Sequence, residues 1–412
     1  MDPGSTPSKA TGSWAFGWHD DDTHNAANLV AKVSNNNADK VVINAELINI
    51  ATINNKQGST VEIELKDNSW SPFILVGDEN HLAGNNLSSD WMNDNLPYIG
   101  CLNLQQLTIP GSHDAGMSEI NYPAGGNSDN AQTQSMGIYN QLVAGVRYFD
   151  IRPTISHKQF YTGHYSKAAG TNLGANGQSI ADVISDINRY LSYKQNELII
   201  LELTHSSFTD DDYQPFSDAQ WNNLLLQFYQ DLDHLYTGHG EDVLTTIPLS
   251  EFIKDGPAVV VLTNERSMDF LRDHHFLNRG FFSSQGGSNQ FPSYNSYSNT
   301  NSLNKMRKDQ YDKLVEQNGN PDSNDQVHVL SWTLTQDVAT DILGGGAGIR
   351  DLARVANGHL AQVGSNVPYT GPVSWAAKTK PPNIILIDDV SMDRFLVSLA
   401  LGLTRFYNKA CS

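Results

Sequence analysis

The segment Ile180–Leu203, IADVISDINRYLSYKQNELIILEL, decides the fold class of this chain. Its first part, Ile180–Lys194, has apolar residues at helical spacing, and its second part, Leu198–Leu203, is a short run of Leu and Ile with one Glu. A helix followed by a strand that is apolar on both faces is typical of a parallel sheet covered by helices.

The same alternation continues through the rest of the chain after residue 101. Further strand-like runs are Gln106–Ile109, Val146–Ile151, Gln159–Tyr161, Ala258–Leu262, Val327–Trp332 and Asn383–Ile387, and further helical windows are Asp218–Leu235, Leu303–Gln317 and Met392–Asn408. About eight strands in a region of roughly 310 residues favour a closed barrel over an open sheet. We therefore predict an α/β fold, a TIM-type (β/α)8 barrel, with a long polar loop at Ser283–Asn304.

The first part of the chain has a different pattern. The runs Leu29–Val33, Val41–Ile48 and Thr60–Leu65 alternate in the manner of strands and are separated by Asn-rich turns. This pattern predicts a small antiparallel β-domain, of the sandwich type, in residues 1–95, followed by the barrel in residues 96–412. Residues 82–100 read as the linker, and the β-domain as a possible binding module.

The net charge limits the partners of this protein. Lys and Arg number 26 and Asp and Glu number 45, which gives a net charge of −19. A field of this sign repels nucleic acid and anionic membranes, so a phosphate has to be captured by a local site. We expect no nucleic-acid partner, a monomeric protein, and only transient contact with a membrane surface.

Composition also bears on the compartment. Charged residues make up only 17% of the chain, which is typical of extracellular proteins, and no apolar run approaches the ~20 residues of a membrane span. The N-terminal residues lack the basic and apolar regions of a secretion signal. The chain reads as a secreted protein without its signal, and a cytoplasmic location stays open.

The two cysteines, Cys101 and Cys411, exclude a multi-disulfide scaffold and a four-cysteine zinc site. Cys101 precedes the first predicted barrel strand and Cys411 follows the last helix. These two ends are neighbours in a closed barrel, so a disulfide between the two cysteines is possible. Two free thiols are the alternative, and the sequence does not decide between them.

Polar residues gather where the predicted strands end. The first strand is followed by His113 and Asp114, the second by Asp150 and Arg152, the third by His164, the fourth by Glu202, Thr204 and His205, and the last by Asp388 and Asp389. The carboxyl ends of parallel barrel strands meet at one mouth, so these side chains are expected to converge there.

These residue types suit one kind of chemistry. Two histidines can act as general base and general acid, because imidazole titrates near neutral pH, and a neighbouring carboxylate can hold the tautomer of each. An arginine between them offers a fixed pair of donors to a phosphate that gains charge. The set describes phosphodiester cleavage by an adjacent hydroxyl without a metal. A metal site at His113, His164 and Asp150 is the alternative, although Arg152 would repel the ion.

The motifs LTIPGSHDAG (107–116), GVRYFDIR (145–152) and Gly163-His164 resemble the X-type catalytic domain of phosphatidylinositol-specific phospholipases C. The bacterial and fungal single-barrel members are the most similar ones, and the resemblance covers roughly residues 101–412. It implies that His113 is the base that deprotonates the inositol 2-hydroxyl and that His164 is the acid that protonates the departing diacylglycerol. It also implies that Arg152 stands where metal-independent members carry arginine and calcium-dependent members carry a ligand.

The resemblance further implies supporting carboxylates. Asp114 would pair with His164, Asp150 would support the phosphate and nucleophile region, and an aspartate after the last strand would orient His113. Asp388 and Asp389 point to opposite sides if the strand continues, and Asp388 is preferred because it directly follows the apolar run.

Departures from the family pattern concern the substrate headgroup. Thr204 stands where bacterial members carry lysine, with Glu202 two residues earlier on the same face. Asn264 stands where an inositol-contacting arginine is expected, and Tyr294 or Tyr297 would supply an aromatic ring that packs on the inositol. Glu202, Asp150 and Asp114 leave a minority possibility of a calcium site, and otherwise no cofactor is expected.

Three functions follow from these residues. The first is a phospholipase C-like phosphodiesterase that acts on a phosphoinositide-type glycerophospholipid through a cyclic phosphate. The second is a metal-dependent glycerophosphodiesterase-type barrel, and the third is a catalytically altered protein that binds a surface ligand. Turnover in the presence of a chelator separates the first two, and the absence of turnover favours the third.

Overall fold

The computed structural model describes most of the chain from residue 89 to residue 411 and five strands before it. The residues left out of this range are 169, 195, 239–241, 286–288, 324, 337–345, 363–370, 377, 393–394 and 409–410. In the first 88 residues the described segments are β1 (Gly12–Phe16), β2 (Leu29–Ser34), β3 (Thr60–Glu64), β4 (Leu75–Gly77) and β5 (Leu82–Gly84).

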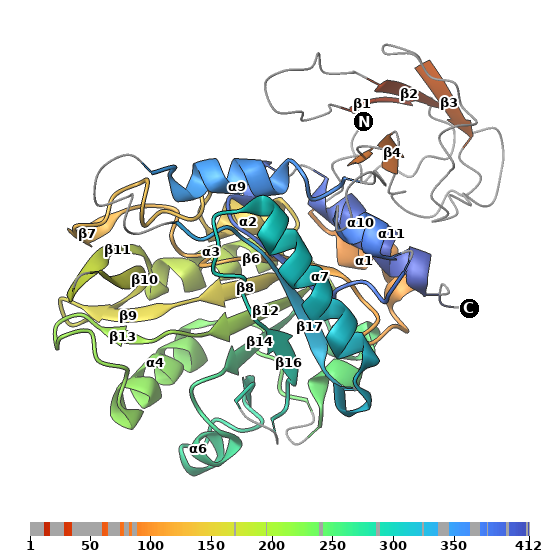
Figure 1. Cartoon of the computed structure of the whole chain (residues 1–412). Helices are drawn as coiled ribbons and strands as arrows, with labels where there is room; N and C mark the ends of the chain where they lie inside the picture. Colours follow the sequence, from red (N-terminus) through yellow and green to blue (C-terminus); the bar gives the residue numbers. More distant parts are fainter. Residues whose placement is uncertain are drawn as a thin grey trace.

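The main sheet has eight strands, all paired in parallel, and it curls into a barrel (Figure 1). In spatial order the strands are β15 (Phe281–Ser283), β14 (Ala258–Thr263), β12 (Leu198–Leu203), β8 (Tyr148–Ile151), β6 (Ile109–Ser112), β18 (Ile384–Ile387), β17 (Val327–Trp332) and β16 (Ser293–Asn295). This confirms the predicted barrel. Closure is incomplete, because β15 and β16 are the two edges of the sheet and no pairing joins them among the described residues.

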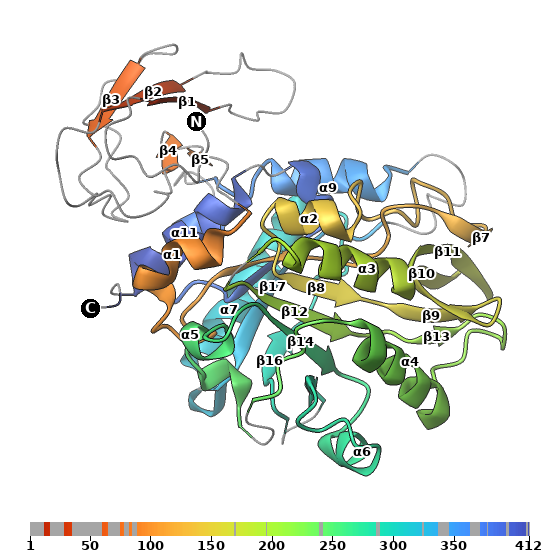
Figure 2. The same cartoon turned by 180° about the vertical axis from the view of Figure 1, so that it is seen from behind.

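Helices cover the outside of this sheet (Figures 1 and 2). They are α1 (Trp91–Ile99), α2 (Ile138–Val143), α3 (Ile180–Leu191), α4 (Asp218–Asp231), α5 (Leu249–Phe252), α6 (Met268–Asp273), α7 (Leu303–Gly319), α9 (Ile349–Asn357), α10 (Pro372–Ala376) and α11 (Leu396–Tyr407). The four predicted helical windows correspond to α3, α4, α7 and α11. Helix α3 begins after Ser179, whose hydroxyl accepts a hydrogen bond from the Asp182 N–H at 3.0 Å. Among the described residues, no helix has both the length and the apolar character needed to cross a bilayer.

The alternation of side chains along the barrel strands divides the core into two apolar clusters. One fills the barrel and includes Ile109, Tyr148, Ile200, Val260 and Leu386, and the other packs under the helices and includes Phe149, Leu201, Val261 and Ile385. Because side chains alternate with a period of two, the next interior positions toward the strand ends are Asp150, Glu202 and Asp388. The polar site therefore lies directly above an apolar barrel interior.

A second sheet of five strands extends from the mouth of the barrel (Figure 1). Its order is β13 (Ser207–Phe208), β9 (Pro153–Ser156), β10 (Gln159–Ala168), β11 (Thr171–Ser179) and β7 (Asn121–Ala124). Arg152 lies between β8 and β9, so one nearly continuous segment passes from the barrel into the second sheet. The prediction that Gln159–Tyr161 is the third barrel strand is therefore wrong, because β10 pairs antiparallel with β9 and β11.

The predicted polar loop at Ser283–Asn304 also needs correction. It contains β16, which pairs with β17, and its Gln290 and Phe291 are buried. Both β15 and β16 have three residues, too few for a recognisable period-two pattern.

The N-terminal strands match the prediction only in part. β1 pairs antiparallel with β2, but β2 pairs in parallel with β3, so the sheet is not purely antiparallel as expected. The predicted strand Val41–Ile48 lies outside the described residues. A sandwich domain and a binding role in this region stay predictions.

The segment expected to be a linker contains helix α1, which packs with the barrel. Trp91, Met92 and Ile99 are buried and belong to the apolar cluster of the barrel interior. The Trp91 indole N–H donates to the Gly145 carbonyl at 2.9 Å, and the Asn93 N–H donates to the Glu197 carboxylate at 3.0 Å. Residues 91–95 therefore pack with the barrel.

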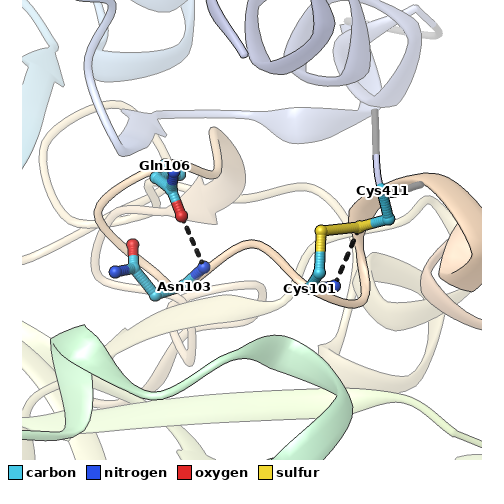
Figure 3. Close-up of a disulfide and its surroundings, with 4 residues drawn as sticks. All are labelled: Cys101, Asn103, Gln106 and Cys411. Atoms are coloured by element: carbon cyan, nitrogen blue, oxygen red, sulfur yellow. Dashed lines mark hydrogen bonds between the residues drawn. A yellow bond between two sulfur atoms is a disulfide. The ribbon is translucent and has the colours of Figure 1, made fainter. Parts of the chain in front are cut away.

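The two ends of the barrel region are joined covalently. Cys101 and Cys411 form a disulfide with their Cα atoms 5.7 Å apart, as Figure 3 shows. The Cys411 N–H also donates to the Tyr98 carbonyl at 3.2 Å, and the nearby Asn103 N–H donates to the Gln106 side chain at 3.1 Å. Of the two possibilities that the sequence left open, the structure has the bridge.

Candidate active site

His113 follows strand β6 and is held by the aspartate that follows β18. Its Nδ1 lies 2.7 Å from Oδ1 of Asp388, and its backbone N–H donates to the Ile387 carbonyl at 3.0 Å. Asp389 instead accepts hydrogen bonds from the hydroxyls of Ser135 and Ser391 at 2.7 and 2.6 Å. Asp388 is therefore the residue placed to orient His113.

Asp388 also raises the pKa of His113. Burial by itself would lower the pKa of this imidazole, but the charge of Asp388 and the hydrogen bond to it outweigh burial and the charge of Arg152. The pKa of His113 is therefore raised above its usual value. A raised pKa strengthens an imidazole as a proton acceptor.

His164 is held by the same kind of partner. It lies on β10 of the second sheet, and its Nδ1 is 2.6 Å from Oδ2 of Asp114, a carboxylate that is fully buried. Each of the two histidines thus has a carboxylate at Nδ1, which leaves Nε2 as the atom available for proton transfer.

Arg152 lies between the two histidines and bonds to the carboxylates around them. Its Nε donates to Oδ2 of Asp150 at 3.1 Å, and its Nη1 lies 3.5 Å from Oδ2 of Asp114. Its Nη2 lies 2.6 Å from Nε2 of His113. Burial opposes the charged guanidinium, but Asp150 and Asp114 outweigh burial and raise the pKa of Arg152.

Asp150 connects Arg152 to the end of strand β12. Its Oδ1 accepts a hydrogen bond from the Thr204 hydroxyl at 2.6 Å, and its Oδ2 accepts one from the Asp114 N–H at 3.0 Å. Burial would raise the pKa of Asp150, but the charge of Arg152, together with His113, His205 and the Thr204 hydrogen bond, outweighs burial, so the pKa lies well below its usual range. Asp150 is therefore ionised at neutral pH.

Buried side chains from the loop before α2 support the site. Gln134 donates to the carbonyls of His113 and Ile387 at 2.9 and 3.2 Å, and the Thr133 hydroxyl donates to the Asp114 carbonyl at 2.8 Å. Asp114 has a left-handed backbone with φ of 42°, a conformation uncommon for a residue with a side chain. Such strain persists where surrounding contacts enforce it.

Glu202 lies on β12, level with Asp150 of the neighbouring strand β8. Its two carboxylate oxygens accept hydrogen bonds from the Tyr148 hydroxyl and, at 3.0 Å, from the Ser284 hydroxyl. Burial raises the pKa of Glu202, with a contribution in the same direction from Asp150.

The carboxylates considered for a minority calcium site, Glu202, Asp150 and Asp114, all have other partners in the structure. Calcium needs six to eight oxygen ligands, whereas Arg152 bonds to Asp150 and contacts Asp114. Glu202 is engaged by Tyr148 and Ser284. Among the described residues, no group of three or more His, Cys, Asp or Glu side chains is arranged to hold a metal ion.

Of the residues expected to contact the substrate headgroup, Tyr294 lies away from the two histidines and Arg152, and Asn264 lies at the mouth. Tyr294 stacks on His328, with ring centroids 5.6 Å apart. His328 is level with Asn383, five residues before Asp388, so this stack is separated from Asp388 by ~16 Å along the strand direction, toward the end of the barrel opposite the mouth. Asn264 follows β14 at the mouth, where its backbone N–H donates to the Leu203 carbonyl at 3.4 Å. Tyr297, the other candidate, is 61% exposed.

The structure adds a third histidine to the mouth. His205 follows Thr204, and its Nδ1 lies 2.9 Å from the Thr204 hydroxyl oxygen. Its position at the end of a predicted strand was visible in the sequence, but its contact with Thr204 was not. No sequence signal identified Gln134 or Thr133, because they lie in an irregular loop.

Comparisons with known proteins agree with this arrangement. No protein-family model matches the chain. The chain is 31% identical over 137 residues to a PI-PLC X-box domain-containing protein of Dictyostelium discoideum, a match that covers 30% of this chain and 17% of that protein. It is 28% identical over 167 residues to 1-phosphatidylinositol phosphodiesterase of Listeria monocytogenes, covering 40% of this chain and 45% of that protein.

A solved structure shows the same fold. A variant of the phosphatidylinositol-specific phospholipase C of Staphylococcus aureus superposes with a TM-score of 0.50 at 16% identity, covering 76% of this chain and 96% of that one. The resemblance seen in the sequence motifs is therefore confirmed, and so is the barrel fold. The chain spans less than half the length of the curated relatives described above.

Proposed function

We propose that this protein is a phosphodiesterase of the phosphatidylinositol-specific phospholipase C type. Its substrate would be a glycerophospholipid with an inositol headgroup, which it would reach by transient contact with a membrane surface. The proposal rests on one observation above all: two histidines at one mouth, each bonded through Nδ1 to a carboxylate, with a guanidinium between them.

The reaction is an intramolecular transfer. Nε2 of His113 takes the proton of the inositol 2-hydroxyl, whose oxygen then forms a bond to phosphorus. The bond between phosphorus and the diacylglycerol oxygen breaks, and that oxygen takes the proton from Nε2 of His164. The products are diacylglycerol and an inositol cyclic phosphate, and each histidine ends in the protonation state opposite to the one in which it began.

Arg152 supplies the charge that the phosphate requires. Its guanidinium can give two parallel hydrogen bonds to the non-bridging oxygens, and these strengthen as negative charge builds on them. To do so it would release Nε2 of His113, which it contacts at 2.6 Å, at the moment when the phosphate arrives. We infer that the reaction needs no metal, because the arginine occupies the position from which a cation would act.

A panel of substrates tests this function. Purified protein is incubated with phosphatidylinositol, a glycosyl-phosphatidylinositol anchor and lysophospholipids, each with and without a chelator. We expect release of diacylglycerol from phosphatidylinositol that a chelator does not affect. Activity that a chelator abolishes supports the glycerophosphodiesterase-type alternative, and no turnover on any substrate supports a binding protein.

A further inference from the structure

Three imidazoles at the mouth are each held through Nδ1 by an oxygen atom. For His113 and His164 that oxygen belongs to a carboxylate, whereas for His205 it is the hydroxyl of Thr204 at 2.9 Å. The proposed reaction uses the first two histidines and leaves His205 without a role.

The hydrogen bonds around Thr204 fix the tautomer of His205. The ionised Asp150 can only accept, so the single proton of the Thr204 hydroxyl points to Oδ1 of Asp150 at 2.6 Å. The Thr204 oxygen must then accept its other hydrogen bond from Nδ1 of His205. This leaves Nε2 of His205 as an acceptor with a free lone pair.

The surroundings keep His205 uncharged. Partial burial at the mouth lowers its pKa, and the charge of Arg152 acts in the same direction against Asp150, Asp114 and Glu265. A hydroxyl partner does not raise the pKa as the carboxylate partner of His113 does. At neutral pH, His205 is therefore a neutral acceptor.

The turn that carries His205 is firmly anchored. His205 has a left-handed backbone with φ of 51°, and the next residue, Ser206, donates its N–H to the Glu265 carboxylate at 2.7 Å. Thr204 and Ser206 are buried on either side, while part of the surface of His205 is open to solvent. Its Nε2 is thus held at the mouth, open to a bound molecule.

We propose that Nε2 of His205 accepts a hydrogen bond from a headgroup hydroxyl other than the reacting one, and so helps the site to select a polyhydroxylated headgroup. This inference rests on the proposed function and names one determinant of its specificity. Because His205 is two hydrogen bonds from Asp150, which holds Arg152, it borders the place where the phosphate would bind.

Two substrates and three variants test this role. One substrate is phosphatidylinositol, and the other is the same lipid with a cis-2-hydroxycyclohexyl headgroup, which keeps the reacting hydroxyl and no other. The variants are His205→Leu, His205→Gln, which restores an acceptor, and the control His275→Leu. His275 is also an exposed histidine with a left-handed backbone, φ 62°, but it follows α6 on the approach to β15, away from the mouth.

The measured quantity is the ratio of kcat/KM for the two substrates. We expect His205→Leu to lower the preference for phosphatidylinositol about 3- to 10-fold, as loss of one neutral hydrogen bond does. His205→Gln should recover most of that preference, and His275→Leu should not change it. An unchanged ratio would overturn the proposal. If both kcat/KM values fell equally, His205 would only support Thr204, and if neither fell, it would have no role.

A binding measurement without turnover distinguishes failure of this inference from failure of the proposed function. Calorimetry with myo-inositol 1-phosphate and with cis-2-hydroxycyclohexyl phosphate gives the same ratio without turnover. If the wild-type protein cleaves neither lipid, the proposed function fails, while a 3- to 10-fold loss of inositol selectivity in His205→Leu would still support the inference. Equal affinity of the wild-type protein for both ligands would refute it.

Discussion

Nη2 of Arg152 lies 2.6 Å from Nε2 of His113, so the cation of the site contacts the nitrogen that is proposed to take a proton. A guanidinium only donates, so Nε2 must accept and His113 must carry its proton on Nδ1, toward Asp388. The same contact thus fixes the tautomer of His113 that the proposed reaction requires.

The first prediction concerns Arg152. Arg152→Ala should lower kcat/KM for phosphatidylinositol by ~10²–10³-fold, as removal of one group that stabilises a transition state typically does. Arg152→Lys should recover only part of this loss, because a point charge cannot give two parallel hydrogen bonds. Full activity of the lysine variant would show that charge alone suffices.

The second prediction concerns pH. The proposed base must be neutral, so kcat/KM should rise with pH through the raised pKa of His113. Asp388 raises that pKa, so Asp388→Asn should move the acid limb of the profile to lower pH while also lowering the maximal rate. An acid limb that stays in place, measured over pH 4 to 9 on a soluble substrate, would mean that another group controls it.

The third prediction concerns the two histidines. His113→Ala and His164→Ala should each lower turnover by ~10²–10⁴-fold, the usual contribution of a general acid–base group. Circular dichroism and thermal unfolding would establish that the variants are folded, and His275→Ala serves as a matched control. Losses below about tenfold for both variants are incompatible with the assignment.

The fourth prediction concerns the disulfide. Replacing both Cys101 and Cys411 by Ser should lower the free energy of unfolding by about 2–5 kcal/mol, measured with a chemical denaturant. Activity at low temperature should be retained, because the bridge lies before β6 and after α11, at the end of the barrel opposite the mouth. Titration of the unreduced, denatured wild-type protein should find no free thiol, and two reactive thiols would contradict the bridge.

Much of the barrel was readable because its signals are local. The strands Leu198–Leu203 and Val327–Trp332 are short runs in which apolar residues predominate, and the structure has both with the predicted bounds. Short strands gave no such signal, so β15 and β16 were missed. The run Gln159–Tyr161 was assigned to the wrong sheet. It pairs antiparallel with the strands directly before and after it, β9 and β11, in two hairpins that were not recognised in the sequence.

The site, too, could be predicted in part from the sequence. Placing polar residues at strand ends brought His113, Arg152, Asp150 and Asp388 together, because parallel strands end at one edge. Asp388 was preferred over Asp389 as the partner of His113 because it directly follows the apolar run, and in the structure its Oδ1 lies 2.7 Å from Nδ1 of His113. Tyr294 was misplaced because its strand was not recognised, so its level in the barrel was unknown.

The most direct test of the proposed reaction is the first product formed from phosphatidylinositol in ¹⁸O-labelled water that contains a chelator. Attack by the 2-hydroxyl predicts an inositol cyclic phosphate, seen by ³¹P NMR and mass spectrometry, with no ¹⁸O and at the rate found without chelator. A first product that is acyclic and carries ¹⁸O, or a reaction that stops with chelator and resumes with calcium, would contradict the metal-independent transfer by His113, His164 and Arg152.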